Sequence, residues 1–275
     1  MFTPLTSLQN SRVKNVVKLR QRRQRDAQRL TVVEGVRETA RALQRQIIPQ
    51  EAFICPELMA GPDAETAVSH LRQLAQTHAV QLFTVTPDIF AKMAYREDSG
   101  GFLLVVPYWQ RALADFAINP PAFLTVVEGV EKPGNFGAIL RTADAAGADG
   151  VILSHTETTA SLDLYNPNAV RASLGTIFSV PTTSDTNSQV IDWLRQQGIS
   201  IIATTPAATV PYTAVSLTGP VALVMGSEAH GLSAEWLTAA DQQVMIPMRG
   251  IADSLNLSVA AALLLYEVVR QRSES

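Results

Sequence analysis

The chain has 275 residues, enough for one large domain or two ordinary ones, and its 47% hydrophobic and 17% charged residues are typical of a protein with a buried core. A single cysteine, Cys55, excludes an internal disulfide and a cysteine-cluster metal site, and the four histidines lack the spacing of metal ligands. The N-terminus has no apolar signal core and the longest apolar run is far below the ~20 residues of a membrane span, so we expect a cytoplasmic protein without metal or membrane attachment.

The net charge of −3 conceals a strong asymmetry along the chain. The first 50 residues carry 11 basic and 3 acidic side chains, a net charge of +8, whereas the other 225 residues carry a net charge of −11. Arginine outnumbers lysine nine to two in this basic segment, which favours phosphate recognition because guanidinium groups bind phosphate bidentately. The segment therefore indicates a polyanionic partner, and a solvated helix face is the alternative.

Apolar periodicity predicts alternating helices and strands in residues 1–106, and hence a small α/β domain. A helix over residues 11–30 is expected to begin at Ser11, which would serve as its N-cap. The other expected elements are strands at 31–35, 51–56, 81–85 and 101–106 and helices at 36–46, 65–80 and 87–94.

Residues 107–121 contain three prolines, and we interpret them as a linker. A second α/β series occupies residues 122–275, and its strands are continuous apolar runs, as expected for a parallel sheet that is buried on both faces. The strands are expected at 122–129, 150–154, 199–205, 221–226 and 242–247, and a long helix at 257–273.

A glycine-containing turn follows the first of these strands. Gly134 and Gly137 form only G-x-x-G, without the first glycine of a dinucleotide-binding fingerprint, so the turn gives little support to a nicotinamide-dependent oxidoreductase. Arg141 lies four residues after Gly137, and a cation near the start of a helix opposes the helix dipole. Such a placement indicates a functional demand on Arg141, with an ion pair to Glu128 or Glu131 as the alternative.

Two further polar turns follow buried strands. In "VMGSEAHGLS" two glycines flank Ser227 and Glu228 at the carboxyl end of a strand, the edge where open α/β sheets bind ligands. In "IPMRGIADSLNLS" three polar residues precede the closing helix, and capping that helix requires only one of them. The segment "NPNAVRASLG", which contains Arg171, lies between the first turn and the second.

The three turns "EKPGNFGAILRTADAAG", "VMGSEAHGLS" and "IPMRGIADSLNLSVAAALL" resemble the ordered motifs of the SpoU/TrmH family of RNA ribose 2′-O-methyltransferases. The intermediate "VRASLG" also matches, and the resemblance covers residues 123–272. The N-terminal "SRVKNVVKLRQRR" and "VVEGVRE" resemble, more loosely, the ribosomal-protein-like RNA-binding domain of many members. The layout is similar to that of the thiostrepton-resistance and related ribosomal RNA methyltransferases.

The resemblance implies an RNA-binding α/β domain followed by a trefoil-knotted methyltransferase domain that binds S-adenosyl-L-methionine and forms a homodimer. The residues it assigns to the cofactor are Gly226, Ile246 and Leu255. The residues it assigns to the catalytic site are Asn135, Arg141, Glu228, Ser254 and Asn256. For RNA contacts we expect Arg20, Arg22, Arg23, Arg25 and Arg171, with ribosomal RNA as the expected substrate and transfer RNA as the alternative.

The family assigns Arg141 to the activation of the ribose hydroxyl. Because a guanidinium is a very weak proton acceptor, Arg141 acts either after transient neutralisation or as a clamp that stabilises developing negative charge, and we favour the clamp. A non-enzymatic RNA-binding protein would account for the basic segment but not for three polar turns at strand ends. Cofactor binding separates a methyltransferase from that protein and from an oxidoreductase.

Overall fold

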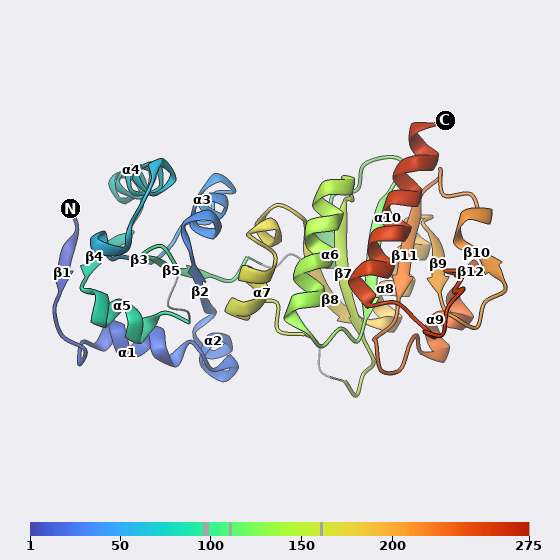
Figure 1. The fold of residues 1–275 in the computed structure, drawn as a ribbon, viewed down its shortest axis with the longest axis horizontal. Coiled ribbons are helices and arrows are strands. Elements are labelled where there is room, and N and C mark those ends of the chain that lie inside the picture. Colours follow the sequence, from blue (N-terminus) through green and yellow to red (C-terminus); the bar gives the residue numbers. More distant parts are fainter. Residues whose placement is uncertain (96–98, 110–111, 160–161, 275) are drawn as a thin grey trace. The chain divides into compact units, whose positions relative to one another are not determined.

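The computed structural model describes residues 1–95, 99–109, 112–159 and 162–274, which form two compact units (Figure 1). Unit 1 comprises Met1–Trp109 and Asp163–Ser179, and unit 2 comprises Gln110–Leu162 and Val180–Ser275. Each unit is an α/β structure with its own sheet, which confirms the predicted α/β class. Among the described residues, no helix combines the length and the apolar character that crossing a membrane would demand.

Unit 1 is built on a mixed five-stranded sheet with the strand order β1-β4-β3-β5-β2. The strands β1, β4 and β3 run parallel, whereas β5 pairs antiparallel with both β3 and β2. Its strands are β1 (Thr3–Leu5), β2 (Leu30–Glu34), β3 (Glu51–Ile54), β4 (Gln81–Val85) and β5 (Phe102–Pro107). Its helices are α1 (Ser11–Lys18), α2 (Arg22–Gln28), α3 (Val36–Gln44), α4 (Pro62–Thr77), α5 (Pro87–Met93) and α7 (Pro167–Ala172).

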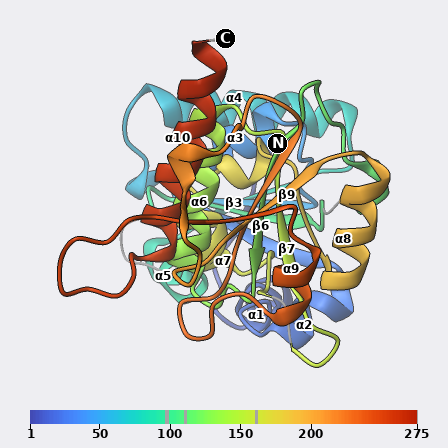
Figure 2. The same cartoon turned by 90° about the vertical axis from the view of Figure 1, so that its right-hand side faces the viewer.

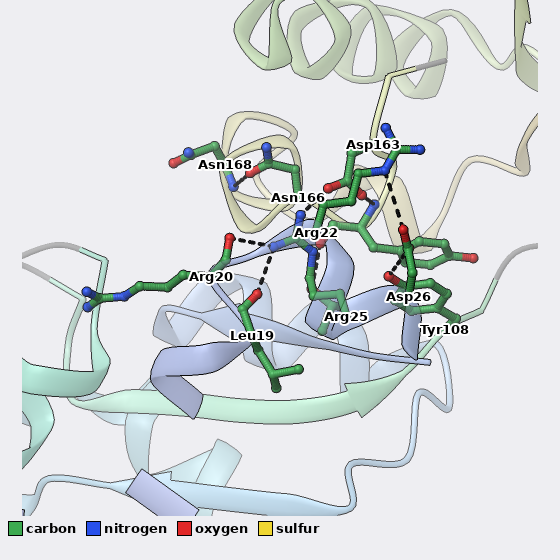
Figure 3. A network of polar contacts seen from close by, with 11 residues as sticks. Leu19, Arg20, Arg22, Arg25, Asp26, Tyr108, Asp163, Asn166 and Asn168 are labelled. Carbon is green, nitrogen blue, oxygen red and sulfur yellow. Dashed lines mark hydrogen bonds and ion pairs between the residues drawn. The ribbon is translucent and has the colours of Figure 1, made fainter. Parts of the chain in front are cut away.

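The single helix expected over residues 11–30 is in fact two helices, α1 and α2, and its N-cap is Asn10 rather than Ser11. The Asn10 side chain accepts a hydrogen bond from the backbone N–H of Arg12. The break is stabilised by a buried arginine. One Arg25 guanidinium nitrogen donates to the carbonyls of Leu19 (2.7 Å) and Arg20 (2.8 Å), which the end of α1 leaves without helical partners (Figure 3).

We expected Arg25 to contact RNA, but its side chain is only 2% exposed, so that expectation is wrong. Its second guanidinium nitrogen forms an ion pair with Asp163, and Figure 3 shows this pair beside the carbonyl contacts. Arginine suits such a position because its planar group can satisfy several acceptors at once. Arg25 therefore organises the end of α1 inside unit 1.

Asp163 begins a short segment, Asp163–Ser179, that belongs to unit 1 although the chain on both sides of it belongs to unit 2. Thr31 donates its hydroxyl proton to the Tyr165 carbonyl at 2.5 Å, and the ring of Tyr165 stacks on that of Tyr108. The domain boundaries expected from the sequence, 1–106, 107–121 and 122–275, grouped this segment with the second domain. Those boundaries stay a prediction. Residues 110 and 111 of the predicted linker lie outside the described residues.

Unit 2 contains a parallel seven-stranded sheet with the order β10-β12-β9-β11-β6-β7-β8, as the continuous apolar runs predict. Its strands are β6 (Phe123–Glu128), β7 (Gly150–His155), β8 (Thr182–Thr186), β9 (Ser200–Thr204), β10 (Val210–Pro211), β11 (Val221–Met225) and β12 (Gln242–Met245). Its helices are α6 (Pro133–Ala146), α8 (Asn187–Gln196), α9 (Ala234–Ala239) and α10 (Leu257–Ser273).

Helices cover both faces of this sheet. Figure 2 shows α6 and α10 on one side and α8 and α9 on the other. The side chains of Leu124, Ile152 and Val224 form a core with Val190 of α8 and the fully buried Trp236 of α9. The sheet therefore holds the loops after β6, β9, β11 and β12 on a rigid base.

Candidate active site

A cavity of about 510 Å³ opens at the carboxyl ends of three neighbouring strands. Thr204 ends β9, Met225 ends β11 and Ile246 follows β12, and all three residues line the cavity. Parallel sheets bind ligands at this edge, and the volume is that of a site for a molecule of cofactor size. The cavity therefore lies where the sequence predicted a ligand.

The cavity brings together most of the residues expected at the site. The predicted residues that line it are Gly226, Glu228, Ile246, Ser254, Leu255 and Asn256. They come from the loop after β11 and from the loop between β12 and α10, which are separate in the sequence. Two expected residues, Asn135 and Arg141, are not among its lining residues. The individual roles of all these side chains stay predictions.

Gly226 is required by the close return of its own loop. A Cβ atom at this position would lie 2.0 Å from the backbone carbon of Gly231 and 2.3 Å from the backbone nitrogen of Leu232. The return is fixed by a backbone hydrogen bond of 3.0 Å from the Gly231 N–H to the Ser227 carbonyl. Both obstacles are backbone atoms, so a larger residue can be accommodated only if the cavity wall shifts.

A polar cluster at the edge of the cavity is centred on the Glu228 carboxylate. One of its oxygens accepts hydrogen bonds from the side-chain amides of Asn135 at 2.7 Å and Asn256 at 2.8 Å. The other oxygen forms an ion pair of 2.6 Å with Lys132. The three loops that the sequence singled out therefore meet at one carboxylate.

The charge state of Glu228 follows from these neighbours. The hydrogen bonds from Lys132 and then Asn135 hold the pKa of Glu228 below its usual value, although desolvation acts in the opposite direction. The same contact raises the pKa of Lys132. Because the carboxyl pKa is lowered by folding, its contribution to stability is present above the ordinary carboxyl pKa and is lost as the pH falls through the lowered value. At neutral pH Glu228 is an anchor for amide donors.

Asn256 has two functions in the cluster. Its side-chain oxygen caps α10 by accepting hydrogen bonds from the backbone N–H of Ser258 at 3.0 Å and from the Ser258 hydroxyl at 2.7 Å. Its side-chain nitrogen meanwhile donates to Glu228. Capping of α10 thus explains the contacts of the Asn256 side-chain oxygen, whereas the side-chain nitrogen contacts Glu228 in the candidate site. Ser254 is exposed at the cavity wall.

Lys132 was missed by the sequence analysis. It is the N-cap residue of α6, and it lines a smaller neighbouring cavity of about 190 Å³ together with Asn135, Ser227 and Glu228. Glu228 lines both cavities and thus lies at their common edge. The only signal in the sequence was the position of Lys132 directly before Pro133, which begins the helix.

Arg141 lies apart from this cluster on an exposed position of α6. The helix begins at Pro133, so Arg141 is about two turns from its start, and the conflict with the helix dipole is weaker than the sequence suggested. Arg141 forms neither alternative ion pair, with Glu128 or with Glu131, among the described residues, and the Glu128 carboxylate instead accepts from Asn187 and from the backbone N–H of Ser233. Within the described part of the chain, Arg141 has no hydrogen-bond or ion-pair partner.

The arginines expected to bind RNA occupy different environments in unit 1. Arg20 donates to the Ala94 carbonyl at 2.7 Å, and Arg22 lies 3.6 Å from the Asp26 carboxylate. Arg23 is exposed, and Arg171 is half-buried in the last turn of α7. Of the four expected arginines near the break between α1 and α2, Arg20, Arg22 and Arg23 are therefore exposed, whereas Arg25 is buried.

We predict that Gly226→Ala abolishes the S-adenosylmethionine binding that the family resemblance implies, because the added methyl group would strike the backbone of Gly231. Isothermal titration calorimetry would measure the affinity, with circular dichroism to confirm folding. Gly219→Ala is the matched control, because a Cβ at Gly219 meets nothing within 4 Å. Equal affinities for the two variants would contradict this account of the cavity.

Comparison with known proteins identifies the family of the chain. The SpoU rRNA Methylase family model matches residues 122–266, and the MRM3-like substrate binding domain model matches residues 10–103. The chain is 27% identical to the 23S rRNA (guanosine(2553)-2′-O)-methyltransferase RlmP of Bacillus subtilis, over 96% of this chain and 98% of that protein.

Two solved structures with bound cofactor are similar over nearly the whole chain. The AdoMet-bound rRNA methyltransferase from Sinorhizobium meliloti has a TM-score of 0.87 at 28% identity, covering 98% of each chain. The SpoU methyltransferase AviRb from Streptomyces viridochromogenes, in complex with AdoMet, has a TM-score of 0.85 at 28% identity, covering 97% of this chain and 100% of that one. The chain therefore belongs to the SpoU rRNA methylase family of S-adenosylmethionine-dependent RNA methyltransferases.

Proposed function

We propose that the protein transfers a methyl group from S-adenosylmethionine to a ribose 2′-hydroxyl of ribosomal RNA. The observation that carries the proposal is the meeting of Asn135, Glu228 and Asn256 at the edge of the cavity that Gly226 and Leu255 line. Relatives that are named 23S rRNA 2′-O-methyltransferases support ribosomal RNA as the substrate. Methylation of transfer RNA is the other outcome that the experiment below can give.

The larger cavity suits the cofactor. The fit rests on the cavity volume and on Gly226, where any Cβ would close the wall against Gly231. We assign Gly226, Ile246 and Leu255 to cofactor binding on this basis. When bound there, S-adenosylmethionine supplies an already activated methyl group. The protein therefore needs no acid to assist the departure of the thioether leaving group.

The chain's own residues must position the ribose hydroxyl and stabilise the charge that develops on it. We assign Asn135 and Asn256 to the orientation of the ribose, with Ser254 at the cavity wall beside it. Glu228 holds the two amides in place, and the contact with Lys132 favours its ionised form further by lowering its pKa. These residues pre-organise the site, but the Lys132 ammonium is paired with Glu228, so we look elsewhere for a positive group that stabilises the ribose oxygen.

Arg141 is the residue that we assign to that role, as an electrostatic clamp on the phosphate next to the target ribose. Its exposed position without an ion pair in the described chain leaves the guanidinium available for a phosphate. A guanidinium keeps its proton at neutral pH, so stabilising an oxyanion suits it better than accepting a proton.

RNA contacts by Arg20, Arg22, Arg23 and Arg171 complete the proposal. Unit 1 carries 15 basic and 11 acidic residues, a net charge of +4, whereas unit 2 carries 7 basic and 14 acidic residues, a net charge of −7. Long-range attraction of RNA therefore falls to unit 1. Arg25 contributes indirectly, because it fixes the turn that carries Arg20 and Arg22.

A homodimer is also part of the proposal. α10 packs against α6 on one side, and on another side it exposes a stripe of large apolar residues at helical spacing. The exposed fractions are 47% for Val259, 38% for Leu263 and 50% for Tyr266. An apolar stripe of this kind is typical of a surface covered by another chain. The trefoil knot and a cytoplasmic location stay predictions.

We predict that the wild-type protein incorporates the methyl group of S-adenosylmethionine into a 2′-O-position of 23S rRNA, and that Arg141→Ala lowers the turnover by about 10²- to 10³-fold, as removal of one charge-stabilising donor does. Methyl incorporation and primer-extension mapping would measure both. Cofactor affinity should stay unchanged. Arg195→Ala, at an exposed arginine of α8, is the control.

Wild-type turnover by Arg141→Ala would remove Arg141 from the mechanism. Methylation of transfer RNA but not of 23S rRNA would replace the proposed substrate, and the absence of any RNA methylation by the folded, cofactor-binding protein would overturn the proposed function.

For the dimer, we predict that Leu263→Glu combined with Tyr266→Glu converts a dimer into a monomer, because the two carboxylates would be buried unpaired in an apolar contact. Multi-angle light scattering would measure the mass. The control is Val210→Glu, which adds a charge at an exposed apolar residue outside α10. A wild-type protein that is monomeric at micromolar concentration would refute the dimer.

A further inference from the structure

Three arginines line one side of α3, and none of them was expected to have a role. Arg37, Arg41 and Arg45 are spaced four residues apart, with Arg45 as the C-cap, so they project from the same side of the helix. We call them the α3 arginine row. Like charges at this spacing repel one another, so the row is unfavourable for the isolated helix.

The row lacks the acidic partners that usually neutralise a helix face. Glu38 is the only acid of α3, and it is turned inward and only 7% exposed. None of the three arginines forms an ion pair with any carboxylate in the part of the chain that the structure describes. Burial raises the pKa of the Glu38 carboxyl, while the positive charges of Arg37, Arg41 and Arg171 act to lower it.

The helix dipole does not explain the row. A cation near the C-terminal end of a helix is favourable, which accounts for Arg41 and Arg45. Arg37, however, lies in the first turn of α3, where the dipole opposes a positive charge. It is exposed and forms no hydrogen bond or ion pair within the described residues. The helix dipole therefore gives no reason for Arg37, whose charge is otherwise offset only in part by the buried Glu38 beside it.

The row continues onto the segment Asp163–Ser179. Arg41 donates to the Leu174 carbonyl, and its side chain packs so closely on Gly175 that a Cβ there would lie 3.0 Å from it. Gly175 has a φ of +83°, which a glycine adopts without strain. Arg45 donates to the Ser179 hydroxyl at 3.3 Å. These contacts place the α3 row and the segment that carries Arg171 on one continuous surface of unit 1.

We propose that the α3 arginine row and Arg171 form a second phosphate-binding surface, which holds the RNA backbone separately from the turn that carries Arg20, Arg22 and Arg23. The proposal rests on the RNA substrate proposed above. From Arg37 to Arg45 the helix rises by about 12 Å, so the three guanidinium groups are spread along a length over which they can contact successive phosphates of one RNA strand.

The test measures how the affinity for 23S rRNA depends on salt. Each phosphate contact contributes ~0.7 to 0.9 to the slope of log affinity against log salt concentration. We expect the full-length variant Arg37→Gln/Arg45→Gln to reduce the slope by about 1.4 to 1.8, because it loses two contacts. Arg41 is left intact because it also holds the Leu174 carbonyl.

Two further pairs make the comparison specific. Arg37→Lys/Arg45→Lys keeps the charges and should keep the slope. Arg72→Gln/Arg195→Gln removes two exposed arginines from α4 and α8, which changes the net charge equally outside the row, and should also keep the wild-type slope. Circular dichroism and thermal unfolding, measured for every variant, report whether unit 1 is folded, because the cofactor cavity lies in unit 2. Should the glutamine pair unfold, Arg37→Gln alone is used, with half the expected change.

This inference is overturned if the Arg37→Gln/Arg45→Gln variant shows the same salt dependence of affinity as the wild type. The proposed function stays intact in that case, provided that the wild-type protein binds and methylates 23S rRNA. A reduction no larger than that of the control pair also overturns it, because net charge alone would then explain the effect. A wild-type protein that binds no RNA overturns both proposals.

Discussion

One carboxylate, that of Glu228, holds together parts of the chain that are far apart in the sequence. It accepts hydrogen bonds from Asn135, 93 residues earlier, and from Asn256, 28 residues later, and it pairs with Lys132. The loop after β6, the loop after β11 and the start of α10 are thereby fixed to one another. The cavity that we assign to the cofactor is lined by two of these loops, so its shape depends on this anchor.

The parallel sheet and Gly226 supply the other constraints. Because β9, β11 and β12 are neighbours and run parallel, their carboxyl ends open at one edge. Gly226 then lets the loop after β11 return so closely that its own backbone forms part of the wall. A sheet buried on both faces contributes rigidity, and the polar chemistry is confined to the loops. The excess positive charge belongs to unit 1, whereas unit 2 is acidic.

Much of this could be predicted from local patterns. The bounds of α10, Leu257–Ser273, agree with the apolar periodicity and the polar cap, and the apolar runs indicated the parallel strands. The rest depends on long-range contacts that no local pattern contains. In the sequence Arg25 resembles its exposed neighbours. Its burial is revealed only by the structure, where the guanidinium contacts Leu19, Arg20 and Asp163. Lys132 acquires its role from Glu228, 96 residues away. The strand β8 is polar and lies at the edge of the sheet, so it lacked the apolar signal.

The central claim is that Glu228 assembles the site from its three loops. The most direct measurement is the affinity of Glu228→Ala for S-adenosylmethionine by isothermal titration calorimetry, with Glu235→Ala, at an exposed carboxylate of α9, as the control. Without the carboxylate, Asn135 and Asn256 lose their common acceptor, so the account predicts that the affinity falls in Glu228→Ala and is unchanged in the control. A folded Glu228→Ala protein that binds the cofactor as tightly as the wild type would contradict it.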